Sequence, residues 1–427
     1  MQAVLNVINF ILDLGPSVMM PIIITVLGLA LRQKFSKAFR AGLIIGVGFV
    51  GINMVIGLLM NTLGPVTQAM VRNMGVSLDI IDVGWPISAA VSFGSVVVPI
   101  VMPAILIINV IMLAANWTKT ADVDVWNYWQ ILFCAAIVYH TTNGSWLWTI
   151  VATIICTAVT LILADITAPM VQKFFGLPGV SLPHVGTVGW WPVAYILNKV
   201  LDKIPGINNV YIDQEKIQQK FGLVGEPLFI GLVLGAGMAI LAKYNLANIL
   251  TTSVTLAAVM VILPRMVSIL MEGLIPLSEG AREYLKQRFP DREFYIGLDT
   301  AVVIGHPAVI ATAIIMIPVA VLLAVVLPGN RLLPFTDLIM LTFILSFVVA
   351  TTNGNIFRSL LISMAIVPLC LLIATDFGPV HTVMGQAVGF EFPEGASLIS
   401  SLYGGTLQIP WLIWKPFAIL FNYAPTL

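Results

Sequence analysis

Two polar residues in apolar stretches that Gly and Pro interrupt could together hold a hydroxyl-rich solute. His184 lies in Leu-Pro-His-Val-Gly, and Glu394 lies in Phe-Pro-Glu-Gly, 210 residues further along. An imidazole that donates and accepts, opposite a carboxylate that accepts, provides the hydrogen bonds that a polyhydroxylated compound needs. The sequence leaves a second interpretation of His184 open, in which a neighbouring helix satisfies the ring.

Four further candidates lie where apolar stretches begin or break. Asp82, in Ile-Asp-Val-Gly-Trp-Pro, and Asp299, in Ile-Gly-Leu-Asp-Thr, each precede a long apolar stretch. Each carboxylate either caps a helix N-terminus or holds a solute hydroxyl. Trp85 either stacks on a ring or carbon chain, or belongs to an aromatic belt at a lipid–water interface. His306 interrupts an apolar stretch directly before Pro307.

The motif Thr-Thr-Asn-Gly occurs twice, at 141–144 and at 351–354, an offset of 210 residues. An Asp and a Pro follow both copies at nearly the same spacing. A repeat half the chain long is a feature of the fold and not a solenoid period of ~20–50 residues. Asn143 and Asn353 each precede a glycine that frees the backbone, and a polar doublet at bilayer depth is costly unless it binds a solute or another helix. Both asparagines are therefore candidates for solute contacts.

The elements that must position these residues are membrane helices. Of the 427 residues, 59% are hydrophobic and 9% charged, whereas soluble domains carry roughly 25% charged residues. Mean hydropathy is +1.01. Uncharged runs of about 20 residues, enough to cross a hydrocarbon core, recur at 41–61, 87–115, 244–264, 300–330 and 338–357. The net charge of zero indicates no nucleic-acid partner.

The apolar runs predict about five spans in each half and a final helix at 407–420, about eleven transmembrane helices in all. In the first half the spans are expected at 15–31, 41–60, 87–115, 131–139 and 146–164. In the second half they are expected at 229–242, 249–264, 300–327, 338–350 and 360–374. Residues 177–196 and 378–405 contain too many Gly and Pro for continuous spans and predict re-entrant hairpins, and residues 62–82 predict a surface segment.

The expected fold is an all-α polytopic membrane protein built of two inverted repeats. Residues 1–197 form the first repeat, residues 198–220 a cytoplasmic linker, and residues 221–427 the second repeat with the final helix. Lys and Arg collect in cytoplasmic loops, and the basic clusters at 32–40 and 282–292 lie on one side only if the N-terminus is outside and the second repeat is inverted. Inverted repeats with broken helices are typical of transporters that bind their solute near the midplane.

The sequence lacks the usual signatures of energy coupling and catalysis. There is no Gly-rich loop ending in Gly-Lys-Ser/Thr, no His-Glu-x-x-His and no Cys/His cluster. We therefore expect no cofactor, no metal and no catalytic nucleophile in this chain. The three cysteines lie in apolar segments and are interpreted as small packed hydrophobes.

Three other polar residues have structural interpretations. Asp165 and Asp376 follow apolar spans and are expected at helix ends. His381 lies near a loop and is expected to be solvated.

Several junctions carry a family resemblance that runs in order from about residue 10 to 360. The chain resembles the galactitol-type IIC permease component of the bacterial phosphotransferase system, which is related to the ascorbate-type permeases. The matching motifs are Asp82-Val-Gly-Trp-Pro86, Asp124-Val-Trp-Asn127, Gly144-Ser-Trp146, Ile204-Pro-Gly206, Gly225-Glu-Pro227, Ile296-Gly-Leu-Asp299, Gly305-His306, Pro328-Gly-Asn330, Leu333-Pro-Phe335 and Gly354-Asn-Ile-Phe-Arg358.

The resemblance implies a multi-pass permease of the bacterial inner membrane that translocates a polyol such as galactitol. It implies a homodimer whose subunits divide into a scaffold part, made of helices 1–2 and 6–7, and a transport core. It also implies cytoplasmic IIA and IIB partners, with a phosphocysteine on IIB that phosphorylates the incoming polyol. His184, Asp299 and His306 are then the candidates for orienting the reacting hydroxyl. The basic inner face either docks IIB or only reflects the usual cytoplasmic charge.

Two other functions remain open from the sequence. In an ion-coupled secondary transporter of a polyol or sugar acid, Asp82, Asp299 or Glu226 would carry a proton. A membrane scaffold or sensor would transport nothing and bind no polyol. An ion-coupled transporter would accumulate unmodified solute in vesicles that lack IIA and IIB, whereas a phosphotransferase permease would not. A scaffold or sensor would fail to bind any polyol in a binding measurement.

Overall fold

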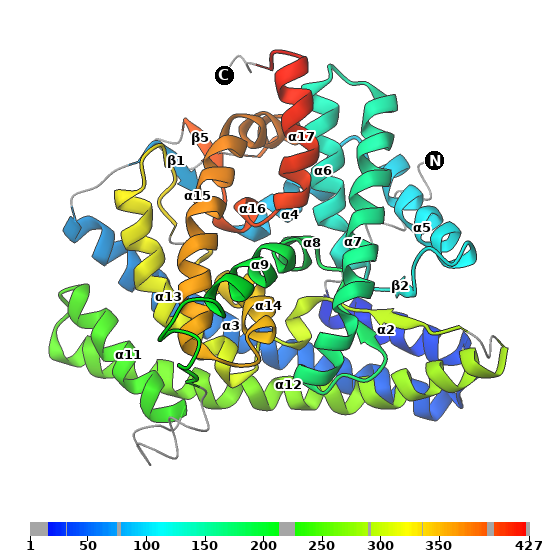
Figure 1. Cartoon of the computed structure of the whole chain (residues 1–427), viewed down its shortest axis with the longest axis horizontal. Coiled ribbons are helices and arrows are strands. Elements are labelled where there is room, and N and C mark those ends of the chain that lie inside the picture. Colours follow the sequence, from blue (N-terminus) through cyan, green and yellow to red (C-terminus); the bar gives the residue numbers. More distant parts are fainter. Residues whose placement is uncertain are drawn as a thin grey trace.

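The computed structural model describes residues 16–30, 32–74, 78–212, 227–288, 292–334, 336–390 and 397–423, and these form a mainly helical protein (Figure 1). Three helices are long and apolar enough to cross a membrane: α7 (Trp146–Phe175), α13 (Pro307–Val326) and α15 (Ile356–Ala387). A fourth candidate is the pair α4 (Trp85–Gly94) and α5 (Val98–Ala114), which is bent by 97°. The prediction of an all-α polytopic membrane protein is confirmed at this level.

Four helices pack together along the lower side of the molecule in Figure 1. They are α2 (Pro16–Ala30), α3 (Phe35–Met74), α11 (Pro227–Leu241) and α12 (Leu246–Arg288). Helices α3 and α12 extend well beyond the expected spans 41–60 and 249–264. The surface segment expected from residue 62 is wrong as far as Met74, because α3 continues through Pro65. Packing of α3 against α12 supports that continuation, although a proline removes a hydrogen bond within a helix.

Five short strands among the described residues form two parallel sheets, which the sequence analysis does not anticipate. They are β1 (Ile80–Asp82), β2 (Thr120–Asp122), β3 (Val180–Ser181), β4 (Tyr295–Gly297) and β5 (Leu398–Ser400). β1 pairs with β5, and β4 lies between β2 and β3. Each sheet therefore joins a strand from one half of the chain to strands from the other half.

The remaining helices of the described residues are shorter. They are η1 (Val125–Asn127), α6 (Tyr128–Thr141), α8 (Val185–Val188), α9 (Trp191–Leu201), η3 (Thr300–Val302), η4 (Leu338–Met340), α14 (Leu341–Thr351), α16 (Leu402–Gly405) and α17 (Gln408–Leu420). Two of these helices come directly after a strand in the chain: α8 follows β3, and α16 follows β5. These strand–helix units occupy parts of the stretches expected as hairpins, but residues 378–387 belong to α15.

Three interpretations of polar residues are wrong. Asp165 and Asp376 lie inside α7 and α15 and not at their ends. The helices continue because each carboxylate finds partners sideways: Asp165 accepts from the hydroxyls of Thr118 and Thr120, and Asp376 pairs with Lys415. His381 is fully buried in α15 and not solvated. Its ring meets that of Phe133 edge-on, at 5.4 Å between centroids.

The unit β5–α16 packs closely on α15 at Gly405. A methyl group at this position would overlap the carbonyl oxygen of Cys370 and lie 2.9 Å from the Cβ of Ala374. We expect Gly405→Ala to lower the thermal unfolding midpoint of the detergent-purified protein, because overpacking costs about 1–3 kcal/mol. Gly237→Ala is the matched control, since Gly237 lies within α11 with nothing within 4 Å of an added Cβ. Equal midpoints for the two variants would contradict this packing.

Candidate substrate site

Three side chains from separate segments meet around the imidazole of His184. His184 precedes α8 and is 1% exposed. Its Nε2 lies 2.5 Å from the hydroxyl of Tyr403 in α16, 2.8 Å from the amide nitrogen of Gln130 in α6, and 3.6 Å from Oδ2 of Asp299. Two of the partners belong to the second half of the chain. The site therefore depends on the way the two halves interleave.

The hydrogen bonds around Gln130 assign the tautomer of His184. The backbone N–H of Gly186 donates to Oε1 of Gln130 at 2.9 Å, so the amide nitrogen of Gln130 is the atom that faces His184. Because that nitrogen only donates, Nε2 of His184 must accept. The ring proton is then on Nδ1, which lies 2.7 Å from the hydroxyl of Thr187. The imidazole is neutral, and its Nε2 accepts from Gln130 and from the hydroxyl of Tyr403.

The two carboxylate oxygens of Asp299 have different roles. Oδ1 accepts from the backbone N–H of Ala301 at 2.7 Å and so caps η3. Oδ2 faces His184 at 3.6 Å, too far for a direct hydrogen bond. Because Nε2 of His184 already accepts from Gln130 and Tyr403, Oδ2 of Asp299 is the acceptor that a solute hydroxyl can use. The two roles that the sequence leaves open for Asp299 are therefore compatible.

More buried polar groups adjoin Asp299. Asp124 accepts from the backbone N–H of Asp299 at 3.1 Å, and Asn127 donates to Asp122 at 3.2 Å. Among the described residues, three buried side-chain atoms of this region have no protein partner: Nε1 of Trp85, Oδ1 of Asn127 and Oγ1 of Thr300. Buried polar atoms normally have partners, so this combination of acceptors and donors suits a ligand with several hydroxyl groups.

Asp82 accepts backbone hydrogen bonds on both of its oxygens. The donors are the N–H groups of Gly84 and Leu402 on Oδ1, and of Thr336 and Asp337 on Oδ2, at 3.1–3.3 Å. The side chain is 2% exposed. This arrangement favours the structural role that the sequence leaves open for Asp82.

Asp337 completes the same junction. Its carboxylate accepts from the backbone N–H of Trp85 at 2.8 Å and from that of Tyr403 at 3.1 Å. Asp82 and Asp337 thus tie the start of α4 to the start of α16. Because Tyr403 reaches His184 from α16, this junction positions one wall of the site. The ring of Trp85 meets the ring of Trp126 edge-on at 6.1 Å.

The other candidate residues that the structure describes lie apart from the His184 network. His306 precedes α13, where its Nδ1 accepts from the N–H of Ala308, and its ring packs on Phe174 with 4.6 Å between centroids. Asn143 and Asn353 have φ of 54° and 53° in the turns after α6 and α14, and both side chains are exposed. Glu394 lies outside the described residues. Solute contacts of these four residues stay predictions.

The sequence analysis misses several members of the network. Asp124 and Asn127 belong to one of the matching motifs, but no chemical role was inferred for them. Gln130 lies in an apolar helix and Tyr403 in a Gly-rich stretch, and neither stands out by sequence alone. The one available signal for Gln130 is its amide group within an otherwise apolar run at 128–138.

Apolar spans, a sharply bent helix pair and a buried polar network built from both halves of the chain are typical of a membrane permease. A family model described as "PTS system sugar-specific permease component" matches residues 10–395. The chain belongs to this family: it is the membrane permease component of a sugar phosphotransferase system, and a multi-pass protein of the inner membrane.

Curated relatives agree with this assignment. The chain is 38% identical over 413 residues to the "PTS system galactitol-specific EIIC component" of Escherichia coli strain K12, an alignment that covers 97% of this chain and 91% of the relative. The protein of the same name from Escherichia coli O157:H7 gives the same values. A "Putative permease IIC component" of strain K12 is 37% identical over 399 residues, covering 93% of this chain and 91% of the relative.

Proposed function

We propose that this IIC subunit translocates galactitol or a similar polyol and presents it to a phosphorylated IIB partner. The names of the relatives support the solute class. The observation on which the proposal rests is Oδ2 of Asp299, a carboxylate oxygen that faces the buried His184 network at 3.6 Å from Nε2 of His184, too far for a direct hydrogen bond. A polyol carries a hydroxyl donor on every carbon and can supply the hydrogen bond to this oxygen.

In the proposed site each group has a defined part. Oδ2 of Asp299 accepts from one solute hydroxyl, and the hydroxyl oxygen of Tyr403 accepts from a second. Gln130 holds His184 and Tyr403 in place through its two amide N–H groups. The unpartnered atoms of Asn127 and Thr300 extend the site along the carbon chain. Trp85 closes it with an apolar ring face and an N–H donor.

The proposed transfer step uses groups of both proteins. A polyol hydroxyl oxygen attacks the phosphorus of the phosphocysteine on IIB, an oxygen–phosphorus bond forms and the phosphorus–sulfur bond breaks. The cysteine leaves as a thiolate, and the hydroxyl proton passes to the carboxylate of Asp299. This chain therefore needs no nucleophile of its own, since the phosphoryl group arrives on its partner.

We also propose that the two halves are inverted repeats, with residues 1–197, 198–220 and 221–427 as first repeat, linker and second repeat. The strand pairing supports this arrangement, because the two halves exchange strands. β1 of the first half pairs with β5 of the second, and β4 of the second half pairs with β2 and β3 of the first. Helices α2, α3, α11 and α12 would form the scaffold through which two subunits associate. The N-terminus would then be outside, with Lys199 and Lys203 on the inner face beside IIB.

Uptake by proteoliposomes tests the proposed function. With phosphorylated IIA and IIB enclosed inside, we expect radiolabelled galactitol to appear inside as a phosphate ester. Without the two partners, we expect no accumulation above the external concentration, with or without an imposed proton gradient. Accumulation of unmodified galactitol that depends on the proton gradient would contradict the proposal and favour an ion-coupled transporter.

A further inference from the structure

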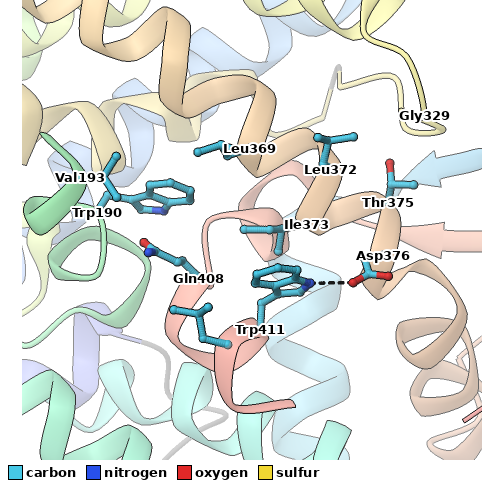
Figure 2. A pocket seen from close by; sticks show the side chains of 11 residues that line it. Trp190, Val193, Gly329, Leu369, Leu372, Ile373, Thr375, Asp376, Gln408 and Trp411 are labelled. Atoms are coloured by element: carbon cyan, nitrogen blue, oxygen red, sulfur yellow. Dashed lines mark hydrogen bonds between the residues drawn. The ribbon is translucent and has the colours of Figure 1, made fainter. Parts of the chain in front are cut away.

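A recess lies away from the His184 network, between α15, α17 and the start of α9. It has a volume of about 450 Å³. Figure 2 shows Trp190 and Gln408 on one side, Trp411 and Asp376 on the other, and leucines of α15 above them. No residue of the proposed polyol site lines it.

The apolar part of this recess faces the hydrocarbon of the membrane. Leu369 and Leu372 lie on α15, and Leu412 lies on α17. They are 44%, 36% and 54% exposed. Because α15 is long and apolar enough to cross a membrane, we infer that its exposed leucines contact lipid tails and that the recess opens to the bilayer.

The polar part of the recess lies at a membrane surface. Asp376 follows Ile356, the first residue of α15, by 20 residues. At 1.5 Å per residue this is about 30 Å, the thickness of the hydrocarbon core. The neighbouring Thr375 receives a hydrogen bond from the backbone N–H of Arg331, which forms an exposed ion pair with Asp79. Tryptophans such as Trp411 are common at this depth.

The polar part of the recess contains one ion pair and one buried acceptor without a hydrogen-bond donor. Lys415 pairs with Asp376 at 2.6 Å, and both side chains remain about one-third exposed, at 37% and 31%. The indole N–H of Trp411 donates to the same carboxylate at 2.7 Å. Oε1 of Gln408 is buried and has no partner in the protein. A ligand here must offer a negative group to Lys415 and an N–H or O–H donor to Asp376.

We propose that this recess is a binding site for one zwitterionic phospholipid with a primary ammonium headgroup. Its phosphate would lie beside Lys415, and its ammonium would donate to the carboxylate of Asp376. One acyl chain would follow Leu369, Leu372 and Leu412. A primary ammonium has N–H donors for this carboxylate, whereas a trimethylated ammonium has no N–H to donate. The site requires only that the protein is embedded in a bilayer and does not depend on the solute.

Native mass spectrometry of the delipidated full-length protein tests this proposal. With equal amounts of dioleoyl phosphatidylethanolamine, phosphatidylcholine and phosphatidylglycerol, we expect one bound phosphatidylethanolamine, retained at least fivefold over each of the others. Asp376→Asn should remove most of that preference. Asp202→Asn is the matched control, because Asp202 forms an ion pair with Arg358 near the other end of α15. It should leave the preference unchanged.

A pocket-filling variant keeps the test informative if the loss of a charge disturbs the protein. Leu412→Trp places a larger side chain in the recess and should reduce phosphatidylethanolamine retention to the level of the other lipids. Equal retention of all three lipids by the unchanged protein would overturn the proposal, as would an Asp376→Asn protein that keeps the preference. A Leu412→Trp protein that loses its dimer but keeps the lipid would instead indicate a contact between two copies of the chain.

Discussion

Asp299→Asn is expected to weaken galactitol binding to the purified protein by about 10- to 100-fold, as measured by isothermal titration calorimetry. Hydrogen bonds to charged groups contribute about 1.5–3 kcal/mol, and 1.4 kcal/mol corresponds to a factor of ten. The cap of η3 survives in this variant, because an amide oxygen can still accept from the N–H of Ala301. The loss should therefore reflect Oδ2, which faces His184, and not unfolding of the segment.

His184→Ala is expected to weaken binding to a similar extent, because it removes the group that holds the hydroxyl of Tyr403 beside Asp299. The matched control for Asp299→Asn is Asp79→Asn, the same substitution at an exposed carboxylate. A hydrogen bond from Arg331 holds the pKa of Asp79 below its usual value, so that this carboxylate is charged at neutral pH. The control should bind galactitol as the unchanged protein does. Unchanged binding by both Asp299→Asn and His184→Ala would refute the assigned site.

The largest effect on stability is expected from Asp82→Ala. This change leaves four backbone N–H groups without their acceptor. An unsatisfied buried donor costs about 1–3 kcal/mol, so the variant should unfold at a clearly lower temperature or fail to accumulate in the membrane. Asp82→Asn keeps one carbonyl oxygen and should lose less.

Asp82 acts on the site through Tyr403, and this gives a second readout. Asp82→Asn should fold and yet bind galactitol more weakly, because the start of α16 loses one of its ties. Asp79→Ala is the control for losing an exposed carboxylate and should behave as the unchanged protein in both assays. If Asp82→Ala unfolded at the same temperature as the Asp79→Ala control, Asp82 would not hold this junction together.

The helices that cross the membrane could be predicted from the sequence, because a long apolar run has few alternatives in a chain with so little charge. Their ends could not. The expected span at 146–164 continues in the structure to Phe175, since Asp165 is satisfied by the hydroxyls of Thr118 and Thr120 and does not stop the helix. Such partners are distant in sequence and leave no local signal.

The strands could not be predicted from the sequence either. Each has only two or three residues, and each pairs with a segment from the other half of the chain. No periodicity can develop over such a length. The polar residues before the apolar stretches were nevertheless informative, since Asp82 and Asp299 both lie at the junctions that these strands create.

The repeated Thr-Thr-Asn-Gly motif has the same backbone role in both copies, which is to end a helix. In both copies Asn and Gly have positive φ, 54° and 82° in the first and 53° and 81° in the second, and the N–H of the glycine closes the end of the preceding helix. Asparagine and glycine are the residues that adopt this conformation most readily. The motif therefore marks equivalent helix ends in the two halves.

A structure determined by electron cryomicroscopy with galactitol present tests the central claim most directly. We expect density for one polyol between His184, Tyr403 and Asp299, with a hydroxyl within hydrogen-bonding distance of Oδ2 of Asp299. Polyol density confined to the recess lined by Trp190 and Trp411, with the His184 network unchanged and unliganded, would contradict it.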